Sequence, residues 1–529
     1  MRLIYLRVDR ALSCGGLLDG AELSVSRSQD NTSLSPLCLI GPNGAGKSQL
    51  LQLIAEIFQT AWHQCAPDQE REISNRESLF EVRYRMSPLL EQERVVKLTR
   101  REVNRRIGPV EMEVMTPDGE WESIPPDSKV FLENLPSLVI GYTSGDNETL
   151  SLPFFVSRSG YAEDVREAAL PSKPHARSKV PSIVADNRLL LIDYSTHLEV
   201  LVANLLLSSP ELRKGIIAHA NLEELASFRC VVQLNHAAAP RGGVKLTPEL
   251  RGYLDTFKAL ATCWDHEPKT DVYILDFFVD EAMRQGFSAH FGSAAKLYRA
   301  FHKISLLNDL AIPRAARNRL QRDIDTRRFA SRLPEPQDED KVFRFEQVSF
   351  RRQKGDGHSL LDYVSLSDGE HQFAQILGIF SMIDTADALF ILDEPESHFN
   401  PLWRVQFTKS LLELPNKARG RQEVMLTTHA PFVPCDLPRE QVLIFSRPAD
   451  GRLVIEPPTI ETFGASFDRI LDACFSVSPP ISQVAQDAME RLMNEGTAQE
   501  ISQALTRLGP SVERSFLADR LRQLNSMTP

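Results

Sequence analysis

Residues 41–48 constrain the possible folds of this chain more than any other segment. They read GPNGAGKS and match the pattern GxxxxGK[ST]. The apolar segment LCLI precedes them, and Leu, Ile and Phe recur at helical spacing over residues 49–59. A strand, a glycine loop and a helix in this order bind nucleotide phosphates, whereas a glycine turn that only caps a helix needs no such context. The sequence therefore predicts an α/β fold that binds a nucleotide.

Each residue type in this loop has a chemical task. Gly41, Gly44 and Gly46 allow backbone N–H groups to point inward around phosphate, and the following helix adds a partial positive charge. We expect Lys47 to bridge the terminal phosphates and the Ser48 hydroxyl to ligate Mg²⁺. The predicted nucleotide contacts are Gly41, Pro42, Asn43, Gly44, Ala45, Gly46, Lys47 and Ser48.

A second motif places two carboxylates at the end of an apolar strand. The segment ALFILDE at residues 388–394 ends in Asp393 and Glu394. We expect Asp393 to hold the Mg²⁺ shell and Glu394 to polarise the attacking water. A solvated strand end is the plainer interpretation, but the presence of Lys47 in the same chain favours the catalytic one.

Two further segments could sense phosphate. Residues 366–372, LSDGEHQ, precede a helical pattern, and Ser367 is a natural N-cap residue. Capping leaves the helix N-terminus and the Gly369 N–H accessible to a second phosphate-bearing partner. His429 follows the apolar strand EVMLTT, where the residues alone favour a structural strand-end histidine.

These four segments resemble motifs of ABC-type ATPases, and more closely those of the SMC/RecF-like group of AAA ATPases in prokaryotic DNA repair and in restriction-associated or anti-phage systems. The matching stretches are GPNGAGKS, LSDGE, LFILDEPESHFNP and MLTTHAPFV. The resemblance implies that the protein binds ATP and Mg²⁺ and hydrolyses ATP as a homodimer. Ser367 and Gly369 would contact the γ-phosphate of ATP bound to the opposite subunit. Glu394 would be the catalytic base, and His429 would sense the γ-phosphate.

The resemblance also implies that residues 395–401, with Glu396, His398 and Asn400, contact the partner subunit. From the residues alone they are polar turn residues. Two departures from the family pattern leave the Mg²⁺ shell partly assigned. Asp368 replaces the usual second glycine of the signature, and no glutamine stands in a clear Q-loop. Residues 141–149, with Asp146 and Asn147, occupy the corresponding place.

A chain of 529 residues is too long for one hydrophobic core. Lys47 and Ser367 lie 320 residues apart, so we predict an ABC-type P-loop nucleotide-binding domain that is split by a large helical insertion. The predicted segments are an ATPase lobe at 1–155, a mainly helical insertion at 156–340, a second ATPase lobe at 341–465 and a helical C-terminal extension at 466–529.

The charge distribution restricts the partners. The 60 basic and 71 acidic side chains give a formal charge of −11, which excludes a uniformly basic nucleic-acid coat. Residues 94–106 and 314–332 are nevertheless locally basic. Such runs are usually solvated faces, but DNA backbone binding is the sharper hypothesis for both. The basic residues are Arg94, Lys97, Arg100, Arg101, Arg105 and Arg106 in the first cluster, and Arg314, Arg317, Arg319, Arg322, Arg327, Arg328 and Arg332 in the second.

Other classes of protein fit the sequence poorly. No apolar run approaches the roughly 18 residues that span a bilayer, and the cysteines form no CxxC pair, so we expect a cytoplasmic protein with no membrane partner. A built-in nuclease is disfavoured, because Pro268 interrupts the acidic segment 265–269 and Asp323 and Asp325 fall in an Arg-rich helical pattern. His63 and Cys65 alone make no closed metal site.

The main functional hypothesis is an ATP-hydrolysing, DNA-associated motor or sensor of a bacterial defence or repair system. A nuclease, a methyltransferase or a toxin would be its partner protein. The alternative is an ATP-bound scaffold that holds and releases a separate toxic effector. A transporter ATPase is disfavoured by the large insertion and the missing Q-loop glutamine.

Overall fold

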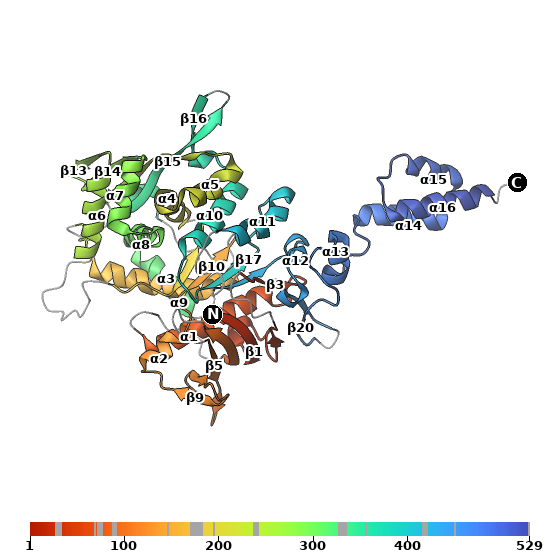
Figure 1. Cartoon of the computed structure of the whole chain (residues 1–529), viewed down its shortest axis with the longest axis horizontal. Helices are drawn as coiled ribbons and strands as arrows, with labels where there is room; N and C mark the ends of the chain where they lie inside the picture. Colours follow the sequence, from red (N-terminus) through yellow and green to blue (C-terminus); the bar gives the residue numbers. More distant parts are fainter. Residues whose placement is uncertain are drawn as a thin grey trace. The chain divides into compact units, whose positions relative to one another are not determined.

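The computed structural model of the chain describes residues 1–26, 34–67, 70, 78–86, 93–144, 148–169, 184–193, 196–235, 243–325, 336–354, 357–414, 422–448 and 451–526. The chain divides into two compact units, Met1–Gly464 and Ala465–Pro529. The first unit contains both parallel and antiparallel sheets with helices between them, which confirms the predicted α/β fold (Figure 1). In the described part of the chain, no helix is long and apolar enough to cross a membrane.

A mostly parallel sheet carries the predicted nucleotide motifs. Its strand order is β11-β10-β17-β18-β3-β19-β20, and only β20 pairs antiparallel to its neighbour. The bounds are β11 (Leu189–Ile192), β10 (Val139–Thr143), β17 (Leu389–Asp393), β18 (Glu423–Thr427), β3 (Leu37–Ile40), β19 (Val442–Ser446) and β20 (Val454–Glu456). The residues of β3, β10, β17 and β18 are all buried, as expected for parallel strands covered on both faces.

An antiparallel sheet formed by the N-terminal part of the chain packs near helix α1 (Lys47–Cys65). Its strands, in spatial order, are β2 (Glu22–Ser24), β1 (Arg2–Arg10), β4 (Leu79–Met86), β5 (Arg94–Arg100), β8 (Glu111–Met115) and β9 (Trp121–Ile124). One hydrophobic cluster joins its inner face to α1 and to β3, β17 and β18. The short ribbon of β6 (Glu102–Val103) and β7 (Arg106–Ile107) and helix α2 (Lys129–Glu133) complete this region. Burial of α1 in this cluster therefore fixes the glycine loop that precedes it.

A second antiparallel sheet has the order β13-β14-β12-β15-β16. Its strands are β13 (Cys263–Glu267), β14 (Val272–Phe278), β12 (Glu224–Gln233), β15 (Phe343–Lys354) and β16 (Gly357–Asp362). Figure 1 shows α6 (Pro248–Leu260), α7 (Glu281–Phe291) and α8 (Ala294–Ser305) gathered beside this sheet, in green. Stacked rings such as Phe228 on Phe277 and Phe257 on Phe301 fill the space between its strands and helices.

This sheet adds strands that the predicted segments did not include. The segment 156–340 does contain helices, but it also contributes β11 to the parallel sheet and β12, β13 and β14 to the antiparallel one. Strands β15 and β16, which we placed in the second ATPase lobe, pair with β12 and not with the parallel sheet. The alternation in ELASFRCVVQ is a strand signal that we overlooked beside the stronger helical patterns. The boundaries of the four segments stay a prediction.

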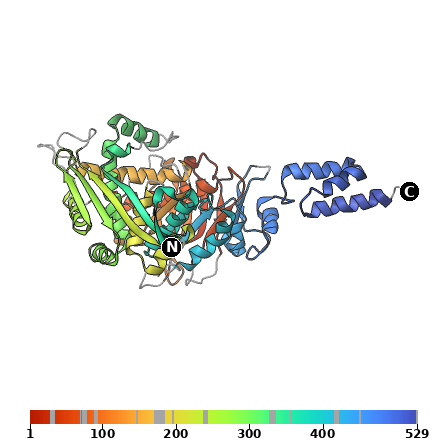
Figure 2. The same ribbon diagram turned by 90° about the horizontal axis from the view of Figure 1, so that it is seen from above.

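The remaining helices of the first unit pack around these sheets. They are α3 (Glu148–Ala168), α4 (His197–Leu207), α5 (Pro210–Ile217), α9 (Arg314–Asp325), α10 (Asp368–Met382), α11 (Pro401–Glu413) and α12 (Phe432–Cys435). The second unit consists of α13 (Phe467–Phe475), α14 (Gln483–Glu495), α15 (Ala498–Leu505) and α16 (Val512–Ser526) (Figures 1 and 2). Met489, Ile501 and Leu517 form its small core. The predicted helical C-terminal region is thus confirmed.

Candidate nucleotide-binding site

The glycine loop lies between β3 and α1, as the sequence predicts, and the helix extends beyond the predicted end at residue 59. Gly41, Gly44 and Gly46 have φ angles of 143°, 76° and 109°, which L side chains rarely adopt. A Cβ atom on Gly41 would lie 2.4 Å from the Phe445 carbonyl oxygen of β19. Both the backbone conformation and the neighbouring strand therefore require glycine at position 41.

Lys47 already occupies the centre of this loop. Its ammonium donates to the carbonyl oxygens of Gly41 at 2.9 Å and Pro42 at 3.1 Å, and the residue is only 5% exposed. Burial lowers the pKa of Lys47, while the carboxylates of Asp393 and Glu394 raise it. The charge is thus held where phosphate oxygens could replace the two carbonyl oxygens as acceptors.

Ser48 and Asp393 meet although they are 345 residues apart in sequence. The Ser48 hydroxyl donates to Asp393 Oδ1 at 3.1 Å, and the Thr427 hydroxyl donates to the same oxygen. Burial raises the pKa of Asp393, and these two hydrogen bonds oppose that change. A serine hydroxyl beside an aspartate carboxylate supplies the hard oxygen ligands that Mg²⁺ prefers, so these two residues fit the predicted Mg²⁺ shell.

Glu394 and His429 project from neighbouring strand ends. Glu394 has a φ of 48°, which is uncommon for a residue with a side chain, and its backbone N–H donates to the Thr427 hydroxyl at 3.0 Å. His429 Nε2 lies 3.3 Å from Glu394 Oε1, and the two side chains are 35% and 45% exposed. Burial and the nearby Lys47 lower the pKa of His429. The histidine that the residues alone marked as structural therefore contacts the predicted catalytic carboxylate.

Ser367 caps α10, as predicted, through a capping box with Glu370. The Ser367 N–H and hydroxyl donate to Glu370 Oε2 at 2.7 and 2.9 Å, and the Glu370 N–H donates back to the hydroxyl at 3.4 Å. Ser367 is exposed, while Gly369 is buried where a Cβ would come within 2.9 Å of the His398 carbonyl oxygen. In the residues that the structure describes, no hydrogen bond joins Ser367 or Gly369 to the loop 41–48.

Residues 395–401 correct one implication of the resemblance. Glu396 is 3% exposed and accepts a hydrogen bond from the Thr428 hydroxyl, so it points into the molecule and not toward a partner subunit. Burial raises the pKa of Glu396 to about 7. Asn400 caps α11 by accepting from the Trp403 N–H at 2.9 Å. His398 Nε2 lies 3.1 Å from the Ser144 carbonyl oxygen at the end of β10.

Sequence reasoning missed three residues that hold this arrangement. Thr427 and Thr428 fix Asp393 and Glu396, and Gln372 of α10 accepts from the His398 N–H at 3.2 Å. The adjacent threonines at the end of EVMLTT were the available signal, because hydroxyls at a strand end can bind neighbouring carboxylates. Asp146 and Asn147, the candidates for the Q-loop, lie outside the described residues.

The first basic cluster is divided between structural and exposed residues. Lys97 pairs with Glu113 at 2.5 Å and lies over the Trp121 ring, and the buried Arg100 donates to the Gly108 carbonyl oxygen at 3.2 Å. These two basic side chains hold the N-terminal sheet together. The exposed basic residues beyond them, Arg101, Arg105 and Arg106, surround the turn between β6 and β7.

The second basic cluster is described only in part. Arg317, Arg319 and Arg322 lie on α9, where Arg319 is 3.7 Å from Asp323 and Arg322 is exposed. Arg314 begins the same helix, whereas Arg327, Arg328 and Arg332 lie outside the described residues. The arginines of α9 therefore remain candidates for backbone-phosphate contacts.

The weaker metal candidates have local partners. His63 Nδ1 lies 2.9 Å from the Glu70 carbonyl oxygen, and the Cys65 thiol donates to the Trp62 carbonyl oxygen. Asp265 lies on the exposed strand β13, and Asp323 lies on α9. Within the described ranges, no group of three or more His, Cys, Asp or Glu side chains is placed to hold a metal ion.

Residues 268–436 match the family described as "AAA domain, putative AbiEii toxin, Type IV TA system". This match includes Ser367, Asp393, Glu394 and His429 and leaves the loop 41–48 outside.

No curated protein matches the chain. The chain is also similar to the SMC head domain from Thermotoga maritima, at 11% identity over 87% of this chain and 100% of that one, with a TM-score of 0.32. A structure of the SMC head bound to the C-winged helix domain of ScpA is 10% identical over 86% of this chain and 97% of that one, with a TM-score of 0.29. The family match and the four motifs confirm the predicted resemblance to ABC-type ATPases of the SMC/RecF-like AAA group.

Proposed function

We propose that this protein hydrolyses ATP between two copies of the chain. The observation that carries the proposal is the meeting of Lys47, Ser48, Asp393, Glu394 and His429 at the carboxyl ends of β3, β17 and β18. This set contains a phosphate-binding cation, a hydroxyl–carboxylate pair for Mg²⁺ and a half-exposed carboxylate at the position expected of a general base.

Each residue of the set has one task in the proposed reaction. Lys47 exchanges its carbonyl partners for phosphate oxygens and balances their charge. Ser48 and Asp393 would hold Mg²⁺, which neutralises charge that develops on the phosphates. Glu394 accepts the proton of the attacking water, and His429 keeps the Glu394 carboxylate in place through the 3.3 Å contact.

The position of Ser367 is the reason for proposing that two copies of the chain form each site. It is exposed at the N-terminus of the fifteen-residue helix α10, and its described contacts stay within the capping box. A helix N-terminus attracts anions, so this end suits the γ-phosphate of a nucleotide held by a second copy. Capping and phosphate binding are compatible, because Ser367 itself is exposed and the helix dipole is unaffected by the cap, whereas Gly369 is buried behind it.

The first experiment replaces Glu394 by Gln. The amide keeps the shape of the side chain but cannot accept a proton, so ATP binding should persist while turnover falls by about 10²–10⁴-fold. Phosphate release measures turnover, and light scattering with ATP and Mg²⁺ should detect a dimer that accumulates. Glu413→Gln on α11 is the matched control, because it removes an exposed carboxylate away from the site. Wild-type turnover in Glu394→Gln would contradict the assignment.

The second experiment tests whether each site uses residues from both copies. Lys47→Ala should lose nucleotide binding, and Ser367→Arg should bind nucleotide but block docking of the partner's γ-phosphate. A mixture of the two variants forms heterodimers that contain one intact composite site, and this mixture should recover part of the turnover. Failure to recover any activity, with heterodimers verified by differential tags, would count against the arrangement in trans.

The proposal also includes a DNA-associated role in defence or repair. Arg317, Arg319 and Arg322 on α9 would bind DNA phosphates without reading sequence. Replacing all three by Glu should weaken duplex binding and reduce its salt dependence, by a slope of about 0.9 for each lost phosphate contact. Basal ATPase activity should be unchanged. Anisotropy titrations with unrelated duplexes measure both quantities.

An alternative function places the protein in a toxin–antitoxin system, the context that the description of the matched family names; that description makes the AAA domain itself the putative toxin and mentions no separate effector. In this alternative, the ATP-bound protein is a scaffold that holds a separate toxic effector. Absence of duplex binding by the ATP-bound wild type would favour the scaffold. Co-purification of a second polypeptide that is released on hydrolysis would support it directly.

A further inference from the structure

The turn between β6 and β7 carries an arginine at a position where the backbone favours glycine. The two central residues of the turn, Asn104 and Arg105, have φ angles of 53° and 61°. A two-residue hairpin loop with positive φ at both positions is a type I′ turn, for which Asn-Gly is a preferred pair. Asn104 fits this preference, whereas the Cβ atom of Arg105 crowds the backbone in this conformation. Because the local backbone does not favour Arg105, its side chain indicates a function.

The β6–β7 ribbon, residues 101–108, has a firmly held base. The buried Arg100 side chain donates to the Gly108 carbonyl oxygen at 3.2 Å. Val110, just beyond the ribbon, exchanges two hydrogen bonds of 2.8 Å with the side chain of Gln64, in the last turn of α1. The ribbon is therefore fixed to the helix that follows the glycine loop.

The tip of the ribbon, residues 101–106, is exposed and basic. Every residue of the tip is exposed, and Val103 is 61% exposed. The one acidic side chain in this stretch, Glu102, lies 3.0 Å from Arg10. The positive charge of the tip is carried by Arg101, Arg105 and Arg106. The tip is therefore locally positive, although the whole chain has a formal charge of −11.

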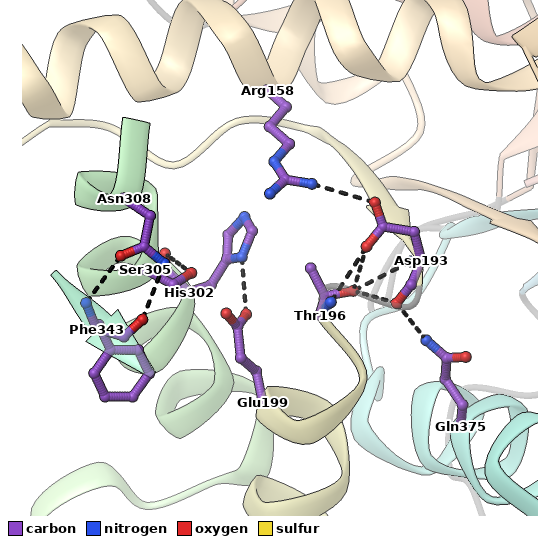
Figure 3. A network of polar contacts seen from close by, with 9 residues as sticks. All are labelled: Arg158, Asp193, Thr196, Glu199, His302, Ser305, Asn308, Phe343 and Gln375. Atoms are coloured by element: carbon purple, nitrogen blue, oxygen red, sulfur yellow. Dashed lines mark hydrogen bonds and ion pairs between the residues drawn. The ribbon is translucent and has the colours of Figure 1, made fainter. Parts of the chain in front are cut away.

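The arginines of the tip differ from arginines that hold the fold together. Arg158 of α3 donates to the carboxylate of Asp193 at 3.2 Å, directly after β11 (Figure 3). Arg229 of β12 lies 2.7 Å from Asp276 of β14. In the part of the chain that the structure describes, no carboxylate forms an ion pair with the three guanidinium groups of the tip. Their charge is therefore available to an anion from outside the chain.

The dimensions of the ribbon suit the major groove of duplex DNA. Its two strands are paired from Arg101 and Gly108 at the base to Val103 and Arg106 at the turn. From base to turn this length is about 10 Å at the rise of a β-strand, similar to the depth of about 8.5 Å of the major groove. A two-stranded ribbon fits the major groove, which is about 12 Å wide, whereas the minor groove is only about 6 Å wide.

We propose that the β6–β7 ribbon enters the major groove of duplex DNA and that Arg101, Arg105 and Arg106 bind the phosphates on the two sides of the groove. The ribbon adds a second contact to that of the α9 arginines, so this inference rests on the DNA-associated part of the proposed function. It does not depend on ATP hydrolysis. A duplex matches the ribbon better than an acidic protein surface does, because its phosphates line both sides of a groove of regular width.

The test uses Arg105→Gly in the full chain without nucleotide. Glycine adopts the conformation of the turn without strain, so the variant should be at least as stable as the wild type, while it loses one phosphate contact. For one contact, counterion release predicts that duplex affinity falls about eightfold at about 0.1 M salt and that the log–log salt slope becomes smaller by about 0.9. Anisotropy titrations at several salt concentrations measure affinity, and urea unfolding measures stability.

Two variants of the same turn are the matched controls. Asn104→Gly changes the neighbouring residue with positive φ but removes no charge, so it should keep wild-type affinity. Arg105→Lys keeps the positive charge and should retain most of the affinity. Replacing all three arginines of the tip by Gln should lower the salt slope about three times as much as Arg105→Gly does.

Modified and alternative ligands identify the groove and the class of partner. The C5 position of pyrimidines faces the major groove, so a duplex with a bulky group at C5 of its cytosines should bind the wild type and the triple Gln variant equally. A single strand of the same sequence, which has no groove, should bind the wild type and Arg105→Gly equally. A poly-glutamate peptide, which represents an acidic protein, should also bind both equally.

Wild-type duplex affinity in Arg105→Gly would overturn the inference, and so would an equal loss of affinity for the single strand or for poly-glutamate. Lower stability of Arg105→Gly would show a structural role for Arg105 and would overturn it as well. If replacing the α9 arginines weakens duplex binding and the ribbon variants do not, the ribbon is refuted while the DNA-associated role stands. If the wild type binds no duplex, both are refuted.

Discussion

The buried carboxyl group of Glu396 predicts how the stability of the protein depends on pH. The carboxyl group lies beneath the ends of β17 and β18, accepts one hydrogen bond from Thr428 and has a second oxygen, Oε2, with no partner among the described residues. Burial raises the pKa of Glu396 from 4.5 to about 7. Because a tenfold change in proton affinity is worth about 1.4 kcal/mol, ionising this group in the folded protein costs about 3 kcal/mol.

The sign of the pH dependence follows from the direction of this change. Between the unfolded and folded pKa values, the folded state binds more protons, so stability decreases as the pH rises and the full cost applies above pH 7. Gln has the shape of the protonated acid and cannot ionise. The stability of Glu396→Gln relative to the wild type should therefore rise by about 2 kcal/mol between pH 5 and pH 8.

Urea unfolding at pH 5 and at pH 8 measures this difference in stability. Tryptophan fluorescence reports the unfolding, and the fully buried Trp62 contributes to that signal. Any effect of the amide on stability that does not depend on pH cancels when the two pH values are compared. Glu440→Gln, which removes an exposed carboxylate of the same unit, controls for the loss of a charge. An advantage of Glu396→Gln that is the same at pH 5 and pH 8, or larger at pH 5, would refute the reasoning.

Other residues of the site give further predictions. Gly41→Ala should weaken ATP binding at least tenfold, because the new Cβ would lie 2.4 Å from the Phe445 carbonyl oxygen and the backbone strain is worth about 1–3 kcal/mol; calorimetric titration that gives wild-type affinity would contradict this. Thr427→Val should lower turnover about 10- to 100-fold, because the Asp393 carboxylate and the Glu394 N–H both lose their hydroxyl partner, whereas Thr427→Ser should retain activity. Asp393→Asn should raise the Mg²⁺ concentration for half-maximal phosphate release by about tenfold or more, and an unchanged Mg²⁺ dependence would remove Asp393 from the predicted shell.

Local sequence was sufficient where a few adjacent residues determine the backbone. The glycines of 41–48, the apolar strand before them and the helix after them predicted the loop around Lys47, because each residue's conformational preference acts within its own segment. The N-cap role of Ser367 was predictable for the same reason, since a hydroxyl three residues before a glutamate forms a capping box within one turn. The sequence pattern placed Asp393 and Glu394 at a strand end, but it did not show which other side chains lie beside them.

The relations between these segments required the tertiary structure. The strand order β3-β18-β17 brings Ser48 to Asp393 and inserts Thr427 between them, and no local pattern specifies which parallel strands become neighbours. Burial likewise turned Glu396 from an apparent contact with a partner into an interior group, because its exposure depends on packing by β18 and α11. The sheet that pairs β12 with β15 joins segments more than a hundred residues apart, and the contact between the Tyr363 hydroxyl and His197 joins residues that are 166 positions apart. Sequence therefore determined the chemistry of each element, and the pairing of distant strands and helices decided which of these chemical groups meet.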